Sequence, residues 1–540
     1  MPQTVREVTY ELLRALGLTT VFGNPGSTEE TFLKDFPPDF RFVLALQEST
    51  AVAAADGFAQ VSRRPALVNV HTAAGLGNAM GTVVTAFMNR TPLILTAGNQ
   101  TREMLLLEPW LTNVEPETLA RPWVKWAYQP VRAQDVPAAF MRAVAIAVQP
   151  PAGPVFLSLP LDDWDRAADG PAVVRTVGSR VAPDPTRLRE FAAAVDDSRS
   201  PVLVLGAAVA RADGWDAAVA LADRLGVPVW AAPASERAPF PEDHPLYAGG
   251  LPFATGPLAE RLSGHDLALV IGAPVFRYYP YVPGSYLPDG MRLLHVTDDP
   301  QEAARAPVGD SLLSDAVLAL DGLKDLVRRR RDRREVTPQE HRMAPHPPPR
   351  RGEVEGVLSA RRALEAVRAA VAPDAVLVEE SPSSLPDLHA VWPIIRPDSF
   401  YTFASGGLGW GLPASVGIAL AERDAGRGRL VVAVIGDGSL QYSVQALWTA
   451  AQHGLAILVV VLRNGEYAIL KSFADLEHTP GVPGLDIPGL DVTALAAGYG
   501  CRSARATTAA EIGAAVDEAR AHSGPTVLEV IISPTVPPLV

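Results

Sequence analysis

The stretch Val431-Val432-Ala433-Val434-Ile435-Gly436-Asp437-Gly438-Ser439 predicts a buried parallel strand that ends in a tight turn. The run is apolar and β-branched and is bounded by glycine, which is typical of a strand covered on both faces. A helix is expected from Gln441 to about His453, and a second buried strand from Ala456 to Leu462. Asn464 follows that strand. Asp437 and Asn464 are therefore expected at the carboxyl ends of neighbouring strands, where open α/β sheets bind ligands.

Asp437 and Asn464 would supply a carboxylate and an amide carbonyl, which are both hard oxygen donors. Such a pair suits a Mg²⁺ ion that keeps its other positions for water, backbone and a phosphate group. Asp-Gly pairs also form ordinary turns after strands, so the Gly-Asp-Gly motif alone leaves a purely structural interpretation open. The asparagine after the next strand favours a metal and diphosphate site.

Length and composition limit the classes of protein to which the chain can belong. With 540 residues it exceeds what one core can organise, and about three domains are expected. The net charge of −13 argues against general affinity for nucleic acid and gives no support for binding to an anionic membrane. The single cysteine, Cys501, excludes an intrachain disulfide. No apolar run approaches the roughly 18 residues of a membrane helix, so a cytoplasmic protein is expected.

The N-terminal region repeats the order strand, turn, helix, which predicts a doubly wound parallel sheet. Helices are expected at 4–16 and 49–60, strands at 20–22, 42–46 and 65–70, and glycine-rich turns at 23–27 and 75–78. Ser27, Glu48 and His71 follow three consecutive strands. Each alone could be structural: Ser27 as a helix cap, Glu48 as a surface acid, His71 as a core histidine. Their equivalent positions in consecutive units indicate a site.

A second α/β unit is expected after Pro160. Its strands are expected at 201–205, 227–230 and 267–271, with a helix at 215–225. Its glycines lack the Gly-x-Gly-x-x-Gly order of a dinucleotide site, so this unit is expected to be structural.

The domain boundaries follow from a basic run at 328–334 and a proline-rich run at 344–350, which together predict a solvated linker. The fold class expected is α/β, with three doubly wound parallel-sheet domains. We place these domains at residues 1–180, 181–330 and 353–540, with the linker at 331–352.

Several separated blocks of the sequence, taken together, resemble one family of enzymes. The blocks are Gly23-Asn24-Pro25-Gly26-Ser27, Ala45-Leu46-Gln47-Glu48, Val70-His71, Gly272-Ala273-Pro274-Val275-Phe276-Arg277-Tyr278, Gly406-Gly407-Leu408-Gly409, Gly436-Asp437-Gly438-Ser439, Asn464-Gly465 and Pro483-Gly484-Leu485-Asp486. In this order they are similar to the thiamine-diphosphate-dependent 2-oxo acid decarboxylases, and among these to the benzoylformate decarboxylases. The resemblance implies an N-terminal pyrimidine-binding domain, a central domain and a C-terminal diphosphate-binding domain.

The resemblance also implies a role for each matching residue. Glu48 would hydrogen-bond the aminopyrimidine of thiamine diphosphate, and Leu408 would support the bent conformation of that cofactor. Mg²⁺, or Ca²⁺ in its place, would be held by Asp437, Asn464 and the carbonyl oxygen of Glu466. The implied cofactor contacts are Asn24, Pro25, Glu48, Ser383, Gly407, Leu408, Asp437, Gly438, Ser439, Tyr442, Asn464, Glu466, Tyr467 and Ala468.

The implied catalytic residues are Glu48, His71, Ser27 and Tyr279. The implied substrate pocket consists of Ser27, His71, Trp110, Leu111, Tyr279, Ile469 and Phe473. In this family two chains contribute to each site, which implies a homodimer at least and a homotetramer as the expected assembly. The expected partner is a small 2-oxo acid, with no nucleic acid and no membrane.

Tyr279 stands where the benzoylformate decarboxylases carry a second active-site histidine. A phenol, with an ordinary pKa of about 10, is a poorer proton donor at neutral pH than imidazolium. The expected activity is non-oxidative decarboxylation of an aromatic or branched 2-oxo acid to an aldehyde and CO₂. Two alternatives stay open: a carboligase or lyase of the same superfamily that makes 2-hydroxy ketones, like acetolactate synthase, and a non-catalytic scaffold with the same fold.

Overall fold

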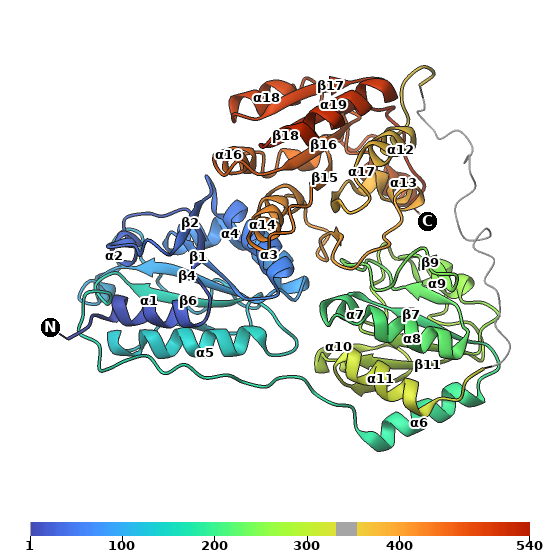
Figure 1. Cartoon of the computed structure of the whole chain (residues 1–540), viewed down its shortest axis with the longest axis horizontal. Coiled ribbons are helices and arrows are strands. Elements are labelled where there is room, and N and C mark those ends of the chain that lie inside the picture. Colours follow the sequence, from blue (N-terminus) through green and yellow to red (C-terminus); the bar gives the residue numbers. More distant parts are fainter. Residues whose placement is uncertain (1, 331–353, 540) are drawn as a thin grey trace.

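The computed structural model describes residues 2–330 and 354–539. Three six-stranded sheets follow one another along the chain, and all strand pairs in them are parallel. Figure 1 shows the three bodies around a central junction, the N-terminal one in blue and cyan, the middle one in green and yellow, the C-terminal one in orange and red. The predicted α/β class is confirmed. The predicted linker at 331–352 lies outside the described residues.

The N-terminal sheet has the strand order β2-β1-β3-β4-β6-β5. Its strands are β1 Thr20–Gly23, β2 Arg41–Leu44, β3 Ala66–Val70, β4 Leu93–Asn99, β5 Ala127–Tyr128 and β6 Val155–Pro160. The helices are α1 Val5–Ala15, α2 Glu30–Leu33, α3 Glu48–Ser62, α4 Thr72–Met88 and α5 Val136–Val148, with short 3-10 turns η1 Leu105–Leu107 and η2 Ala133–Asp135.

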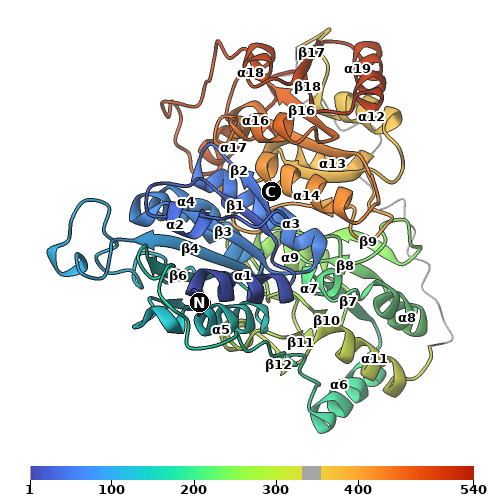
Figure 2. The same cartoon turned by 60° about the vertical axis from the view of Figure 1, so that its left-hand side comes forward.

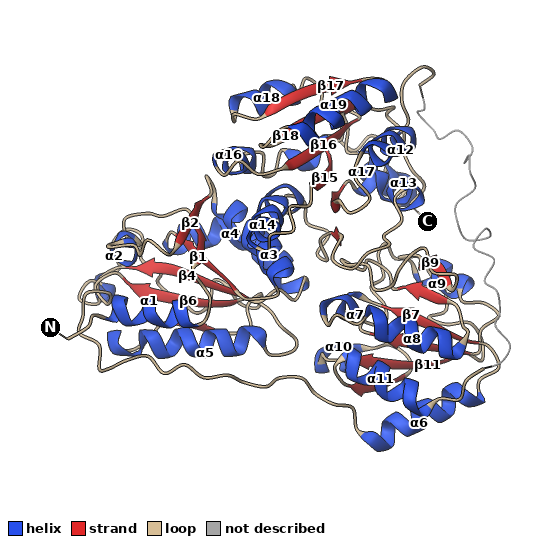
Figure 3. Ribbon diagram, viewed as in Figure 1, coloured by secondary structure: helices blue, strands red, loops and turns tan. Residues whose placement is uncertain are grey.

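Helices cover both faces of this sheet, as predicted (Figure 3). Val21 and Leu67 belong to the core under α1 and α5, whereas the next residues on the same strands, Phe22 and Val68, belong to the core under α3 and α4. Because side chains alternate along a strand, a sheet buried on both faces needs such continuous apolar runs.

The middle sheet has the order β12-β11-β10-β7-β8-β9. Its strands are β7 Pro201–Leu205, β8 Val229–Ala231, β9 Tyr247–Gly250, β10 Leu267–Ile271, β11 Arg292–Thr297 and β12 Asp310–Leu313. The helices are α6 Pro185–Asp197, α7 Ala207–Arg211, α8 Trp215–Leu225, α9 Thr255–Arg261, α10 Pro300–Arg305 and α11 Ala316–Leu326. The predicted bounds of β7, β10 and α8 agree with the structure to the residue.

Ion pairs fill the carboxyl edge of the middle sheet, where an open α/β sheet commonly binds a ligand. Arg90, just after α4, reaches into this edge and pairs with Glu302 at 3.0 Å. Beside it, the buried carboxylate of Glu236 pairs with both Arg211 and Arg277. The Arg90–Glu302 pair ties the middle sheet to the N-terminal domain, and both sets of pairs agree with a structural role for the middle domain.

The C-terminal sheet has the order β14-β13-β15-β16-β18-β17. Its strands are β13 Val376–Glu380, β14 Phe400–Tyr401, β15 Val431–Gly436, β16 Ile457–Arg463, β17 Arg502–Ala506 and β18 Thr526–Ile531. The helices are α12 Ala360–Ala370, α13 Leu385–Val391, α14 Gly411–Asp424, α15 Asp437–Leu440, α16 Ala446–Gln452, α17 Ala468–Leu476, α18 Val492–Gly498 and α19 Ala509–Ala521, with the 3-10 turn η3 Pro382–Ser384.

Helices α3 and α14 join the N-terminal and C-terminal sheets through one continuous apolar core, and Figures 1 and 2 both show them side by side. Glycines permit this close approach. A Cβ at Gly417 would lie 1.7 Å from the carbonyl oxygen of Ala54, and one at Gly57 would lie 2.3 Å from that of Ala414. No described helix is long and apolar enough to cross a membrane.

Three local predictions were wrong. The helix expected at 441–453 is shorter, because α16 covers only Ala446–Gln452, and a separate short helix, α15, precedes the expected range. The expected turn at 75–78 lies inside α4, where Gly75 packs against the Glu48 side chain. The strand expected at 42–46 ends at Leu44, so Glu48 is the first residue of helix α3 and does not end a strand.

Candidate active site

Glu48 is held by two amide side chains at the start of α3. Its Oε1 accepts a hydrogen bond from Nδ2 of Asn24 at 3.3 Å, and its Oε2 accepts one from Nδ2 of Asn78 at 3.1 Å. A Cβ at Gly75 would lie 3.0 Å from Oε1, so glycine leaves the carboxylate its room. In the described part of the chain no lysine or arginine forms an ion pair with Glu48. A carboxylate with neutral partners can accept a further hydrogen bond from a ligand.

His71 caps α4 directly after β3, and a buried carboxylate orients its ring. Nδ1 of His71 lies 2.7 Å from Oε2 of Glu29, which is 1% exposed. Glu29 also accepts hydrogen bonds from the backbone N–H groups of Gly26 and Gly98, at 3.0 and 2.7 Å. An ionised carboxylate only accepts, so the proton lies on Nδ1 and Nε2 is left for a ligand.

Ser27 lies beside this imidazole. A Cβ at Gly26 would fall 2.2 Å from Nδ1 of His71, so the ring rests directly on the backbone that precedes Ser27. Ser27 itself is exposed. The N-terminal domain thus places Ser27, Glu48 and His71, together with Asn24, near the carboxyl edge of its sheet.

Asp437 and Asn464 lie at the ends of the paired strands β15 and β16. The register pairs Gly436 with Leu462, so Asp437 follows the pair by one residue and Asn464 by two. Oδ2 of Asp437 accepts a hydrogen bond from the backbone N–H of Gly465 at 2.8 Å. Oδ1 of Asn464 accepts one from the backbone N–H of Glu466 at 3.2 Å. The carboxylate and the amide oxygen are therefore held in adjacent turns.

These residues fit a divalent cation. Asp437 is 2% exposed, and burial raises its pKa, although hydrogen bonds from the backbone of Gly465 and Gly438 oppose that rise. Among the described residues no lysine or arginine forms an ion pair with this carboxylate. A buried acid beside an amide oxygen is a hard donor set of the kind that Mg²⁺ or Ca²⁺ prefers.

Glycine is needed at position 438 so that the ring of Tyr467 can come close to the backbone, and not because the chain turns there. A Cβ there would lie 2.5 Å from the ring of Tyr467, whereas its φ is not in the left-handed region. Ser439 follows it in α15, and both residues are buried. Tyr442 is half exposed, and Ala468 begins α17. The side chain of Glu466 pairs with Lys471.

The remaining predicted cofactor contacts come from two other segments of the C-terminal domain. Gly407 and Leu408 lie in residues 402–410, which connect β14 to α14; we call these residues the Leu408 loop. Ser383 lies in η3 at the end of β13. Pro25, on the N-terminal domain, is exposed.

The predicted substrate pocket is only partly assembled within one chain. The ring of Tyr279 packs against that of Phe473 with centroids 5.1 Å apart and the ring planes tilted by 36°, which brings the middle and C-terminal domains together there. Ile469 lies on the same helix as Phe473. Trp110 is 93% exposed and Leu111 45%. They lie on the loop after β4 that extends away from the sheet (Figure 2).

Two supporting residues were missed in the sequence. Glu29 orients His71 from the turn after Ser27, and Asn78 fixes Glu48 from α4. Both contacts cross between different strand units of the sheet: Glu29 and His71 follow the neighbouring strands β1 and β3, and Glu48 and Asn78 lie in α3 and α4. The local sequence offered one signal for each. Glu29 lies in the turn just after Ser27, and Asn78 lies in α4, the helix that begins after His71.

Comparisons with known proteins match most of the chain. Three family models match it in order: the N-terminal TPP binding domain of thiamine pyrophosphate enzymes at residues 3–117, their central domain at 188–323 and their C-terminal TPP binding domain at 385–530. The chain therefore belongs to the thiamine pyrophosphate enzymes.

Individual relatives show which thiamine pyrophosphate enzymes this chain is similar to. The chain is 45% identical over 534 residues to a benzoylformate decarboxylase of Pseudomonas aeruginosa, covering 98% of each chain. A crystal structure of benzoylformate decarboxylase from Polynucleobacter necessarius matches with a TM-score of 0.95 and 51% identity over 99% of this chain and 100% of that one. A 4-hydroxybenzoylformate decarboxylase of Rhodococcus jostii matches with a TM-score of 0.92 and 42% identity over 98% and 99%.

Within the thiamine pyrophosphate enzymes the chain belongs to the benzoylformate decarboxylase family, and it is a thiamine-diphosphate-dependent carboxy-lyase. The predicted family and enzyme class are confirmed. The non-catalytic alternative is not supported.

Proposed function

We propose that this enzyme decarboxylates aromatic 2-oxo acids of the benzoylformate type to an aldehyde and CO₂, with thiamine diphosphate bound through Mg²⁺. The observation that carries the proposal is the pair of preformed groups at two sheet edges: the Glu48 carboxylate held by Asn24 and Asn78, and the buried Asp437 beside Asn464. The names of the relatives support the aromatic substrate.

The C-terminal group would hold the diphosphate end of the cofactor. Asp437, Asn464 and the carbonyl oxygen of Glu466 would bind Mg²⁺, while Gly438, Ser439 and Ser383 would lie near the phosphates. Tyr442, Tyr467 and Ala468 complete this proposed surface. The metal is needed because the carboxylate and the diphosphate are both anionic.

When bound, the thiazolium of the cofactor supplies an electron sink that makes loss of CO₂ from a 2-oxo acid possible. Glu48 would accept a hydrogen bond from the pyrimidine ring and stabilise its protonated form. Leu408 would support the cofactor between its two rings. His71, with the proton on Nδ1 and Nε2 open, would exchange a proton with the substrate oxygen, and Ser27 would bind the substrate carboxylate.

We also propose that a second copy completes each site. In the described residues the partners of Glu48 are Asn24 and Asn78, whereas those of Asp437 are Gly438 and Gly465, and the two groups share none. The apolar loop that carries Trp110 and Leu111 is exposed, which suits burial against a partner chain. A homodimer, assembled into a homotetramer, fits these features. Cytoplasmic location and the lack of nucleic-acid and membrane partners stay predictions from composition.

A second activity, carboligation to 2-hydroxy ketones, is favoured by one observation. Tyr279 offers a phenol where, by the resemblance described above, the benzoylformate decarboxylases carry a histidine, and its ring packs against that of Phe473. A slower proton transfer before aldehyde release would leave time for a second carbonyl compound to react.

A substrate panel tests the proposal. With thiamine diphosphate and Mg²⁺ present, kcat/KM for benzoylformate and 4-hydroxybenzoylformate should exceed that for pyruvate by about 100-fold or more, because the pocket carries aromatic rings. A preference for pyruvate would contradict the proposed aromatic substrate.

A further inference from the structure

Two buried carboxyl groups from different domains hold the segment that ends the Leu408 loop. The first is Glu380, at the end of β13, which is 1% exposed. Its Oε1 accepts a hydrogen bond from the backbone N–H of Gly409 at 2.6 Å, and its Oε2 accepts one from that of Gly411. A Cβ at Gly411 would lie 2.9 Å from Cβ of Glu380, so only glycine lets the carboxylate come this close.

The second carboxyl group is Asp56, in the middle of α3 of the N-terminal domain and 0% exposed. Its Oδ2 accepts a hydrogen bond from the indole Nε1–H of Trp410 at 2.7 Å. The same oxygen accepts one from Nδ2 of Asn89 at 2.8 Å, and Oδ1 is held by Gln60 and Thr91. Trp410 itself is 1% exposed. A carboxyl group with four neutral donors is fully satisfied and held in one geometry.

The same network reaches the first half of the loop. Oδ1 of Asn89 accepts a hydrogen bond from the backbone N–H of Ala404 at 2.8 Å, and Thr85 and Ser405 join their hydroxyls at 2.8 Å. The middle of the loop has less support, since Gly406 and Gly407 are exposed and Leu408 is half-buried. Leu408 is therefore held mainly through the residues on either side of it.

The backbone of Gly409, which links Leu408 to Trp410, has little conformational freedom. Its φ of 103° is in the left-handed region, and a Cβ there would lie 2.8 Å from Cβ of Tyr442. The backbone at this residue is confined both by its conformation and by its neighbour. A shift of Trp410 should therefore move Leu408 and cannot be absorbed at Gly409.

We propose that Asp56 and Glu380 are positioning residues. Asp56 fixes the indole of Trp410 from the N-terminal domain, Glu380 fixes the backbone of Gly409 and Gly411 on either side of it, and together they determine where Leu408 lies under the cofactor. This inference rests on the proposed role of Leu408. Neither side chain belongs to the substrate pocket proposed above. Their contribution is geometric: reacting atoms must be held within a fraction of an ångström, and a misplacement of about 1 Å can cost about 100-fold in rate.

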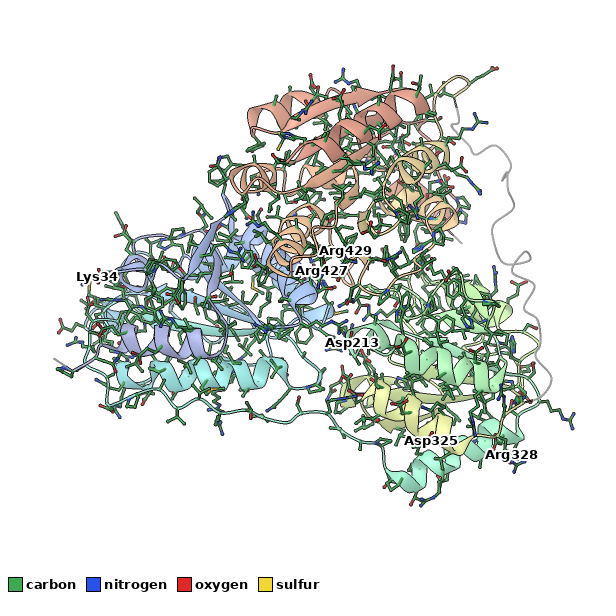
Figure 4. The ribbon with its side chains drawn as sticks, viewed as in Figure 1. Lys34, Asp213, Asp325, Arg328, Arg427 and Arg429 are labelled. Atoms are coloured by element: carbon green, nitrogen blue, oxygen red, sulfur yellow. The ribbon has the colours of Figure 1, made fainter. Side chains whose placement is uncertain are left out.

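The test replaces Trp410 by phenylalanine, which removes the indole N–H and keeps an aromatic ring in the core. Glu380→Gln is the second variant, because an amide keeps one acceptor for the two N–H groups. Trp392→Phe is the matched control, since Trp392 is a 4% exposed tryptophan of the same domain that packs under Arg368. Glu422→Gln controls for loss of a buried carboxylate at the far end of α14, where Arg427 and Arg429 pair with it (Figure 4).

Three quantities are measured on the holoenzyme: kcat and KM for benzoylformate, the dissociation constant of thiamine diphosphate by calorimetry, and the rate of deuterium exchange at C2 of bound cofactor. In Trp410→Phe and Glu380→Gln we expect exchange and kcat to fall together by about 10-fold, with KM changed less than about 2-fold. The control variants should exchange deuterium at the wild-type rate.

Wild-type exchange and kcat in both Trp410→Phe and Glu380→Gln would overturn the inference. A fall in the controls as large as in the test variants would overturn it as well, because the effect would then be general destabilisation. If the wild-type protein itself failed to accelerate exchange over free cofactor, the proposed function would fail, and this outcome is distinct from the other two.

Discussion

Oε2 of Glu29 lies 2.7 Å from Nδ1 of His71, and this contact determines which nitrogen of the imidazole faces a ligand. Glu29 is 1% exposed and its other partners are backbone N–H groups and Thr28, so its carboxylate is held independently of the histidine. The relationship joins the first and third strand units of the N-terminal sheet.

Glu29→Gln should therefore lower kcat by about 10-fold, because the amide can present a donor to Nδ1 and favour the wrong tautomer. In a His71→Ala background the same substitution should cost no further activity. Steady-state kinetics of both singles and the double variant measure this coupling. Additive losses would show that Glu29 acts on something other than His71.

Cofactor retention should depend on a divalent metal. Asp437→Ala, or treatment with EDTA, should raise the dissociation constant of thiamine diphosphate by about 100-fold or more, because the diphosphate then lacks its bridging cation. Calorimetric titration with and without Mg²⁺ checks it. Unchanged affinity in EDTA would rule out the proposed metal site.

Glu380 should make stability fall as pH rises. Burial, the main cause, raises its pKa from 4.5 to about 8, while hydrogen bonds from Gly409 and Gly411 oppose the rise and neighbouring Glu379 adds to it. Between these values the folded protein keeps a proton that the unfolded chain has lost. The folded state binds more protons there, so the free energy of unfolding decreases as pH rises through this window. The loss of stability caused by ionising Glu380 is complete above about pH 8.

The difference in the midpoint of thermal unfolding between Glu380→Gln and wild type should therefore shift steadily in favour of the variant from pH 5 to pH 8. Glu422→Gln is the control with the opposite sign. Burial alone would raise the pKa of Glu422, but hydrogen bonds from Arg429 and Arg427 outweigh it and lower the pKa. Ionised Glu422 therefore stabilises the folded protein above the pKa that this residue has in the unfolded chain, and this contribution is lost only in acid. A constant difference between Glu380→Gln and wild type across this range would contradict the prediction.

Tyr279→His should shift the products made from benzoylformate in the presence of an added aldehyde. An imidazole donates a proton at neutral pH more readily than a phenol, so the variant should release more aldehyde and make less 2-hydroxy ketone than the native enzyme. Product partitioning by chromatography measures the ratio. Equal partitioning in both proteins would show that Tyr279 only packs against Phe473.

Much of the fold could be predicted from local pattern. β7, β10 and α8 match their predicted bounds because apolar runs there end at glycines or at turn residues. Two of the wrong predictions involve glycines. Gly75 and Gly438 stand in a pattern typical of turns, yet both lie in helices and make room for Glu48 and Tyr467. Which side chain packs across a glycine depends on the tertiary structure, and a single sequence does not contain that information.

In the candidate site, too, some residues could be paired from the sequence and others could not. Asp437 and Asn464 could be paired from sequence because the parallel register of consecutive buried strands brings their ends together. Glu29 and Asp56 could not, because their partners His71 and Trp410 come from other units or another domain. Buried acids in an alanine-rich helix or a turn have no local signal that separates them from surface acids.

The most direct test of the account is the stoichiometry of benzoylformate turnover with thiamine diphosphate and Mg²⁺, measured in the wild-type enzyme and in Glu48→Gln. We predict one CO₂ and one benzaldehyde for each substrate consumed, no turnover without cofactor, and a fall in kcat of about 100-fold or more in Glu48→Gln because the charge that stabilises the protonated pyrimidine is lost. Cofactor-independent turnover, or near-native kcat in Glu48→Gln, would contradict it.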